Sequence, residues 1–205
     1  NDNYTNFYVA NCEIRGTTTS ASSVGGIVGS GGWTLNTVGI WDSKISSLGN
    51  SVGGIKGTLS YATITKGFVR NVEVSGAYYV GGVVGKSQSV SNTINYVLVN
   101  ANVTATSHSA GGIIGYIPNA STTSANNITR LNYNMVQSST ITAPYDVGGL
   151  IGRVQADLYK GHFTSDIVVA SVNSTLDGGN VGAVIGSGDR YASGITNLGV
   201  YENTS

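Results

Sequence analysis

Charged residues are scarce in this sequence. Only 20 of the 205 residues are charged, ten of each sign, so the formal net charge is zero. The basic residues form no cluster along the chain. Nucleic acids and anionic membranes are bound chiefly through concentrated positive charge, so we expect no nucleic-acid partner and no membrane-surface partner.

Long apolar runs and paired cysteines are also missing. No stretch approaches the ~18 consecutive apolar residues that span a bilayer, so we expect no membrane insertion. Cys12 is the only cysteine, which excludes an intrachain disulfide, and a lone cysteine is most often a small buried residue. The chain begins at Asn1 without an initiator Met or an apolar signal segment, so we expect a mature product or an excised segment.

Glycine is abundant, with 30 residues, and much of it recurs in one hexapeptide. The hexapeptide reads V-G-G-x-x-G, where both x positions are mostly Ile or Val. Its six copies begin at Val24, Val52, Val80, Ala110, Val147 and Val181. The steps between copies are 28, 28, 30, 37 and 34 residues. A fixed motif at such a period is typical of solenoid architectures.

A second, looser apolar element precedes each hexapeptide, as in Val72-Glu73-Val74 before the third copy. Its apolar residues alternate with polar ones and are mostly β-branched, which is the pattern of a β-strand. Helical spacing is absent. We therefore predict an all-β parallel β-helix, or β-solenoid, with about six coils of roughly 28–37 residues and three short strands per coil. Residues 1–205 form a single array in this interpretation, with a segment of a longer array as the open alternative.

The hexapeptide also predicts which side chains face inward. Lys56 stands where the other copies have Val or Ile, and burying an unpaired Lys is costly, so we expect that position to face solvent. The preceding residue, Ile55 in the same copy, should then face the core. The Gly-Gly pair should mark either a positive φ or a close approach of stacked coils. Ala183 replaces the second of these glycines in the sixth copy.

The six hexapeptides and their spacing of about 30 residues resemble the GLUG motif, and the resemblance covers essentially residues 1–205. GLUG-like repeats occur in large bacterial surface proteins, in adhesins and in non-catalytic regions of bacterial immunoglobulin A peptidases. The resemblance implies an extracellular or cell-surface β-solenoid that serves as a stalk or an adhesive surface. It implies no catalytic residue.

Candidate chemistry is sparse. The G-G-x-x-G spacing differs from nucleotide-binding loops, and His108 and His162 have no partners at metal-ligand spacing, so we expect no cofactor and no metal site. Glu13 and Glu73 occupy equivalent positions two coils apart, a separation of about 10 Å that would suit an inverting glycosidase. We favour the alternative that they are two solvated surface acids. We therefore expect no enzyme activity, with a polysaccharide-active enzyme as the least favoured reading.

Two further features concern the surface. Tyrosines gather beside the hexapeptides, where they either pack over the coil corners or form a contact strip for sugar or protein. They are Tyr78, Tyr79, Tyr116, Tyr145, Tyr159 and Tyr191. Six N-x-[ST] sequences are possible N-glycosylation sites, at Asn119, Asn127, Asn3, Asn102, Asn173 and Asn203. Asn119 and Asn127 lie in a polar stretch expected to protrude as a loop.

The favoured function is thus an extracellular structural module that forms a stalk, fibre or adhesive surface. Both ends of the sequence fall within the upstream element, and neither shows a capping segment. We therefore expect end-to-end stacking, with the chain itself or a neighbouring solenoid segment as partner. The alternative is a recognition module whose Tyr-rich corners bind a host or matrix glycan or protein.

Overall fold

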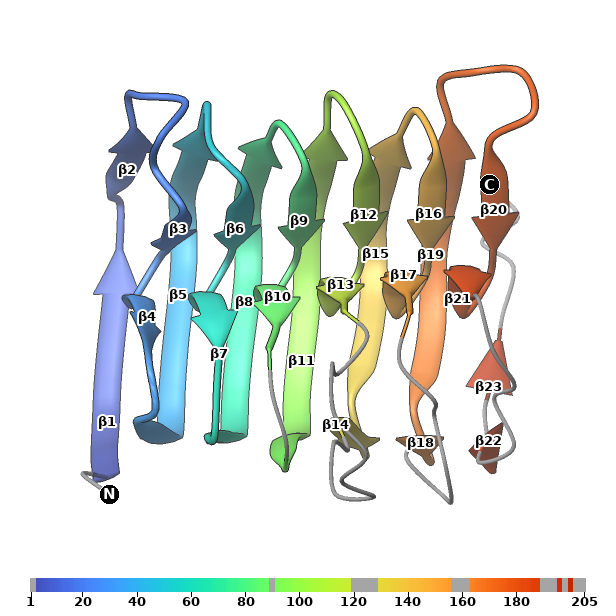
Figure 1. The fold of residues 1–205 in the computed structure, drawn as a ribbon. Helices are drawn as coiled ribbons and strands as arrows, with labels where there is room; N and C mark the ends of the chain where they lie inside the picture. Colours follow the sequence, from blue (N-terminus) through green and yellow to red (C-terminus); the bar gives the residue numbers. More distant parts are fainter. Residues whose placement is uncertain are drawn as a thin grey trace.

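The computed structural model describes residues 3–88, 91–118, 129–155, 163–188, 195–196 and 199–200, and every regular element in them is a β-strand. The strands form three sheets, each made of parallel strands, that extend along the molecule (Figure 1). Since these residues contain no helix, they contain none that could cross a membrane. The predicted fold class, a parallel β-solenoid with three strands per coil, is confirmed.

The first sheet, sheet A, carries the long strands formed by the upstream elements. Its members are β1 (Asn3–Ala10), β2 (Glu13–Gly16), β5 (Thr34–Ser47), β8 (Thr63–Gly76), β11 (Asn92–Ala105), β14 (Thr129–Asn132), β15 (Met135–Ala143), β18 (Phe163–Thr164), β19 (Ile167–Ser174), β22 (Ile195–Thr196) and β23 (Gly199–Val200). The long strands bend where non-glycine residues adopt positive φ. One such row is Asn6, Thr37, Lys66, Tyr96, Tyr133 and Ser165, and a second contains Asn11, Asp42, Asn71 and Ser138.

The hexapeptides form the other two sheets. Sheet B contains β3 (Ser23–Gly25), β6 (Ser51–Gly53), β9 (Tyr79–Gly81), β12 (Ser109–Gly111), β16 (Asp146–Gly148) and β20 (Asn180–Gly182). Sheet C contains β4 (Val28–Gly31), β7 (Lys56–Leu59), β10 (Val84–Ser87), β13 (Ile114–Ile117), β17 (Ile151–Val154) and β21 (Ile185–Gly188). Each hexapeptide therefore bends the chain from sheet B into sheet C.

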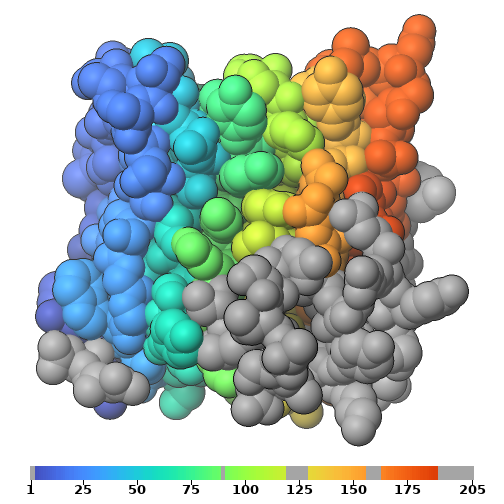
Figure 2. All heavy atoms as spheres, viewed as in Figure 1, coloured from blue at the N-terminus to red at the C-terminus, as the bar shows by residue number. Residues whose placement is uncertain are grey.

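Equivalent residues of successive coils lie beside one another and form the core. Val52 pairs with Val80 in sheet B, and both are fully buried, as are their counterparts Ala110 and Val147. Figure 2 shows the coils as successive bands across the face of sheets B and C. Each coil thus buries its apolar residues against its two neighbours, as expected for a solenoid.

The hexapeptide glycines are required by close backbone approach and not by positive φ. A methyl group at Gly53 would lie 2.1 Å from the carbonyl oxygen of Lys56, within the same coil. One at Gly54 would lie 2.1 Å from the carbonyl oxygen of Gly82, in the next coil. Both distances are far below van der Waals contact. Among the described residues, the glycines with positive φ are Gly31 and Gly178, and both lie outside the hexapeptides.

The expectation that the Lys56 position faces solvent is wrong. Lys56 is 0% exposed, and Val84, its partner in the next coil, belongs to the core. The Lys56 ammonium donates a hydrogen bond to the carbonyl oxygen of Trp33 at 3.3 Å, and burial lowers its pKa to about 8. The predicted inward position is confirmed, since Ile55 is also 0% exposed. Strand alternation failed as a guide because the chain turns between these two residues.

Candidate functional site

Sheet A carries a shallow polar groove on its outer surface, with a volume of about 740 Å³. The groove lies along the bend marked by the second row of positive-φ residues. Its lining comprises Asn11, Cys12, Glu13, Asp42, Ser43, Lys44, Asn71, Val72, Glu73, Asn100, Ala101, Asn102 and Ser138. Cys12 is exposed here, which contradicts the expectation of a buried residue. Its backbone N–H donates to Ser43 Oγ at 3.1 Å, so the bend itself places it at the surface.

The two candidate acids both lie in this groove, and a cation separates them. Glu13 and Glu73 pair with Lys44 from opposite sides, so their predicted equivalence is confirmed. Lys44 Nζ lies 2.7 Å from Glu73, and this contact raises the pKa of Lys44. Glu13 is held by the guanidinium of Arg15. Each carboxylate is therefore neutralised by its own cation, which suits a solvated ion-pair row better than a general acid–base pair.

An apolar stripe crosses the outer face of sheet A below the groove. Tyr8, Gly39 and Phe68 follow one another in register, and the Tyr8 and Phe68 rings stack at 6.2 Å above Gly39. The row continues through Leu98, which is 37% exposed, and Met135. The outer face of sheet A therefore presents both an apolar and a polar row to its surroundings.

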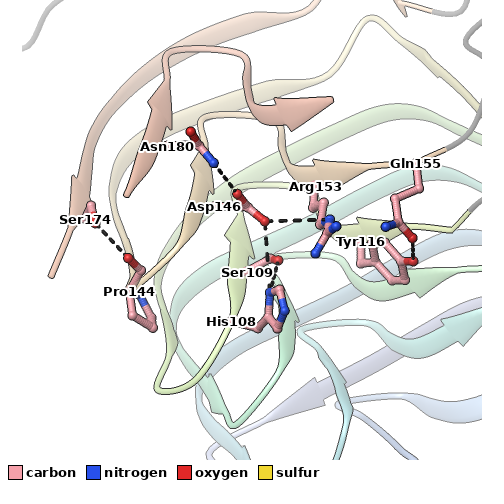
Figure 3. A network of polar contacts seen from close by, with 9 residues as sticks. All are labelled: His108, Ser109, Tyr116, Pro144, Asp146, Arg153, Gln155, Ser174 and Asn180. Atoms are coloured by element: carbon pink, nitrogen blue, oxygen red, sulfur yellow. Dashed lines mark hydrogen bonds and ion pairs between the residues drawn. The ribbon is translucent and has the colours of Figure 1, made fainter. Parts of the chain in front are cut away.

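The corner between sheets B and C holds a polar network around Asp146 (Figure 3). Asp146, at the start of β16, is only 4% exposed. Its Oδ1 accepts a hydrogen bond from Asn180 at 2.8 Å, and its Oδ2 lies 3.8 Å from Arg153 Nε and 4.0 Å from His108 Nδ1. His108 Nδ1 also lies 3.2 Å from Ser109 Oγ. Groups from three successive coils thus surround the carboxylate, and Asn180 binds it by a hydrogen bond.

A small pocket of about 270 Å³ opens at this network. We call it the corner pocket, and it is lined by His108, Tyr145, Asp146, Arg153, Gly178, Gly179, Asn180 and Ser187. Asp146 and Asn180 precede a hexapeptide, whereas Arg153 and Ser187 follow one. Residues that flank the repeated motif on either side therefore meet at the corner, which is the signal that the sequence offered for this pocket.

Four of the predicted corner tyrosines lie beside this network. Tyr79 and Tyr116 stack with ring centroids 4.3 Å apart, and Lys86 lies 5.9 Å from the Tyr116 ring. The Tyr116 hydroxyl donates to Gln155 (Figure 3). Tyr78 and Tyr145 are 43% and 51% exposed. Tyr116 thus packs at the corner, as one reading predicted, while Tyr78 and Tyr145 remain accessible; Tyr159 and Tyr191 lie outside the described residues.

The remaining predicted positions are scattered. Asn3, Asn102 and Asn173 are exposed on strands of sheet A, whereas Asn119, Asn127 and Asn203 lie outside the described residues. His162 also lies outside them. Within the described part of the chain, no three His, Cys, Asp or Glu residues are grouped so as to hold a metal ion.

Asp166 is a buried carboxylate that sequence reasoning did not place. It is 0% exposed and accepts hydrogen bonds from the backbone and side-chain nitrogens of Asn134 at 2.8 and 2.9 Å. Asn134 also accepts a hydrogen bond from the Val97 backbone and donates to the Ile94 carbonyl. Burial raises the pKa of Asp166 to about 6. These contacts tie three coils together, so the group is structural.

Comparison with known proteins finds one distant relative that bears on the function. Over an alignment of 140 positions the chain is 31% identical to halomucin from Haloquadratum walsbyi, and the alignment covers 63% of this chain but 2% of halomucin. The chain therefore spans only a small part of the length of that relative. No family model matches the chain. No solved structure matches it either.

Proposed function

We propose that this chain is an extracellular structural module, a rigid β-solenoid segment that stacks coil upon coil with a neighbouring segment of a larger surface protein. The parallel ladder of similar coils supports a structural role, because such coils extend in one dimension by adding equivalent units. The similarity to a short part of a very large protein supports the idea of a segment. The near absence of net charge suits a surface that interacts through packing and hydrogen bonds.

The observation that carries the proposal is the incomplete burial of the first coil. Val24 and Ile27 are half-buried, whereas their counterparts Val52 and Ile55 in the second coil are fully buried. A coil that packs on the N-terminal face would bury these side chains and pair the edge of β1 that faces away from β5.

The corner of the first coil has room for such a neighbour. In later coils the last hexapeptide glycine lies against the preceding coil, as at Gly57, where a methyl group would be 2.5 Å from the Val24 nitrogen. Gly29 is the equivalent glycine in the first coil. A methyl group at Gly29 would be 3.2 Å from its nearest neighbour, the carbonyl oxygen of Ser23. The N-terminal face thus carries the residue type that a stacked coil needs. The partner is a neighbouring solenoid segment.

The C-terminal face is less able to accept a further coil. Ala183 is exposed in the last hexapeptide and stands where earlier copies have the glycine that touches the next coil. A seventh corner in the same register would meet its methyl group at about 2 Å. The proposal therefore assigns regular stacking to the N-terminal face.

Hydrogen exchange tests this proposal directly. Residues 34–62 form one whole coil, because Asn3 pairs with Thr34 and Leu35 pairs with Ile64. A chain extended by a copy of residues 34–62 before Asn3 should protect the amides of β1 and β3 as strongly as those of β5 and β6. The control is an extension with the same residues in scrambled order. Unchanged exchange in β1 and β3 would refute the proposed stacking face.

A further inference from the structure

We infer that the corner pocket binds a single neutral pyranose ring of a glycan, with the ring stacked on Tyr145 and its hydroxyl groups bound by Asp146 and Arg153. This goes beyond the structural role, because it gives one coil corner a ligand of its own. The pocket volume of about 270 Å³ lies just below the ~300–1,000 Å³ of sites for drug-sized ligands, so it suits one ring better than an extended oligosaccharide.

The apolar side of the pocket is a tyrosine. Tyr145 is 51% exposed, and its ring centroid lies 5.6 Å from that of His108. The Tyr145 backbone is fixed at both ends, since its N–H donates to the His108 carbonyl at 3.3 Å and its carbonyl accepts from Asn180 at 2.6 Å. An accessible ring on a fixed backbone can receive the C–H face of a sugar with little loss of conformational freedom.

The polar side is preorganised. Asp146 is nearly buried; its Oδ1 accepts a hydrogen bond from Asn180, and its Oδ2 faces Arg153 and His108 at 3.8 and 4.0 Å (Figure 3). The Nε of Arg153 is buried and, among the described residues, has no hydrogen-bond acceptor. The nearest carboxylate oxygen is 3.8 Å away, beyond hydrogen-bond distance. The Arg153 side chain as a whole is 25% exposed, so adjacent sugar hydroxyls can accept from the exposed part of the guanidinium and donate to the carboxylate.

The charge balance of the pocket favours a neutral ligand. Asp146 and Arg153 carry opposite charges and lie side by side, so their fields largely cancel at the opening. A free phosphate or an organic cation would find one attractive and one repulsive partner at nearly equal distance. A polyhydroxylated ring needs paired donors and acceptors without net charge, and this pair supplies them.

The rim of the pocket leaves space for the ring. Gly178 and Gly179 come from the connection between β19 and β20, and Gly178 has φ of +81°. A methyl group at Gly178 would have no atom within 4 Å, so the rim is open above that residue. The ring can therefore enter from solvent without displacing a side chain at this point.

Nuclear magnetic resonance titration can detect this binding. The probes are the methyl glycosides of glucose, galactose, mannose and N-acetylglucosamine, with glucuronic acid as a charged comparison. His108 is one of only two histidines, so its ring protons give a resolved signal inside the pocket. A single ring should bind with a Kd on the order of 1–10 mM, given the affinity that so few atoms can supply. At least one neutral glycoside should shift the His108 signal and saturate.

Variants distinguish a binding site from a structural network. Tyr145→Ala and Arg153→Gln should each weaken binding at least about tenfold. Tyr133→Ala removes a similarly exposed ring, 52% exposed, on sheet A and should leave the Kd unchanged. If Arg153→Gln fails to fold, Tyr145→Ala alone tests the binding site, because removal of an exposed ring should leave the fold intact. The inference is overturned if no neutral glycoside shifts the His108 signal, if only glucuronic acid does, or if Tyr145→Ala binds like the unmodified chain.

Discussion

A methyl group at Gly149 would lie 2.0 Å from the carbonyl oxygen of Ala183, the residue that occupies the same hexapeptide position one coil further on. Gly149 is buried between two coils, whereas Ala183 is exposed. The glycine is therefore needed only where another coil stacks on its C-terminal side. Ala183 departs from the repeat at the one copy for which this contact is not formed.

Exchanging these two residue types should have very unequal effects on stability. Gly149→Ala forces a methyl group into the backbone of the next coil and should lower the free energy of unfolding by about 3 kcal/mol or more. Ala183→Gly removes that obstacle and should change stability by no more than about 1 kcal/mol. Gly32→Ala is a matched control, because its nearest contact would be an ordinary 3.4 Å. Denaturant unfolding of the three variants measures these differences.

The same exchange should alter self-association. With Ala183→Gly, the C-terminal corner can accept the first coil of another copy, so head-to-tail dimers should form at lower concentration than in the unmodified chain. Sedimentation velocity over a concentration series measures this change. Equal association of the two proteins would show that Ala183 does not limit stacking.

Lys56 should weaken the fold below pH 8. Burial lowers its pKa from 10.5 to about 8, so the unfolded chain binds the proton more tightly between these pH values. The free energy of unfolding should consequently rise as pH increases from about 8 to 10.5, and the full penalty is present below pH 8. Lys56→Met should therefore stabilise the protein by about 2–3 kcal/mol at pH 7.

The test of Lys56 compares both proteins across this window. Urea unfolding at pH 7 and pH 10 should show a large difference between Lys56→Met and the unmodified chain at pH 7, and a smaller one at pH 10. A difference independent of pH would mean that packing, and not the buried charge, sets the effect.

Asp166 should act in the opposite pH direction. Burial raises its pKa from 3.8 to about 6, so the folded chain binds the proton more tightly between pH 4 and 6. The contribution of this group to stability is most favourable below about pH 3.8 and is lost as pH rises through 6. Asp166→Asn keeps an oxygen acceptor for Asn134 and removes the charge, so it should stabilise the protein by about 2–3 kcal/mol at pH 7.

Thermal or urea unfolding at pH 7 and pH 4 checks this expectation. The gain from Asp166→Asn should be present at pH 7 and should shrink toward zero at pH 4. Val97 and Ile94 are linked to the same network through Asn134, so a loss of stability at both pH values would instead identify an essential carboxylate contact.

Much of the architecture could be predicted because the same residue types recur at the same positions of successive hexapeptides. The copies starting at Val52 and Val80 have the same length and spacing, and the structure places them in exact register. The Gly-Gly pair was expected to mark a positive φ or a close approach of coils, and the close approach proved correct. What a repeat cannot reveal is the direction of a side chain after a turn, and this is why Lys56 was assigned to solvent.

The candidate sites were less predictable for a related reason. Asp146 and Arg153 flank a hexapeptide and differ from the residues that flank the other copies, so averaging over the repeat hides them. Their contact depends on the corner angle between sheets B and C, which no local pattern encodes. Conversely, the equivalence of Glu13 and Glu73 was predicted, but the cation between them was overlooked although Lys44 lies in the same register.

Unfolding of a series of chains with zero, one, two and three added copies of residues 34–62 before Asn3 tests the central claim most directly. If the N-terminal face accepts coils as the inner coils accept one another, each copy adds nearest-neighbour contacts. The urea midpoint and the dependence of unfolding free energy on urea should both rise with each copy, in a single transition. An unchanged midpoint, or separate unfolding of the added copies, would contradict this account.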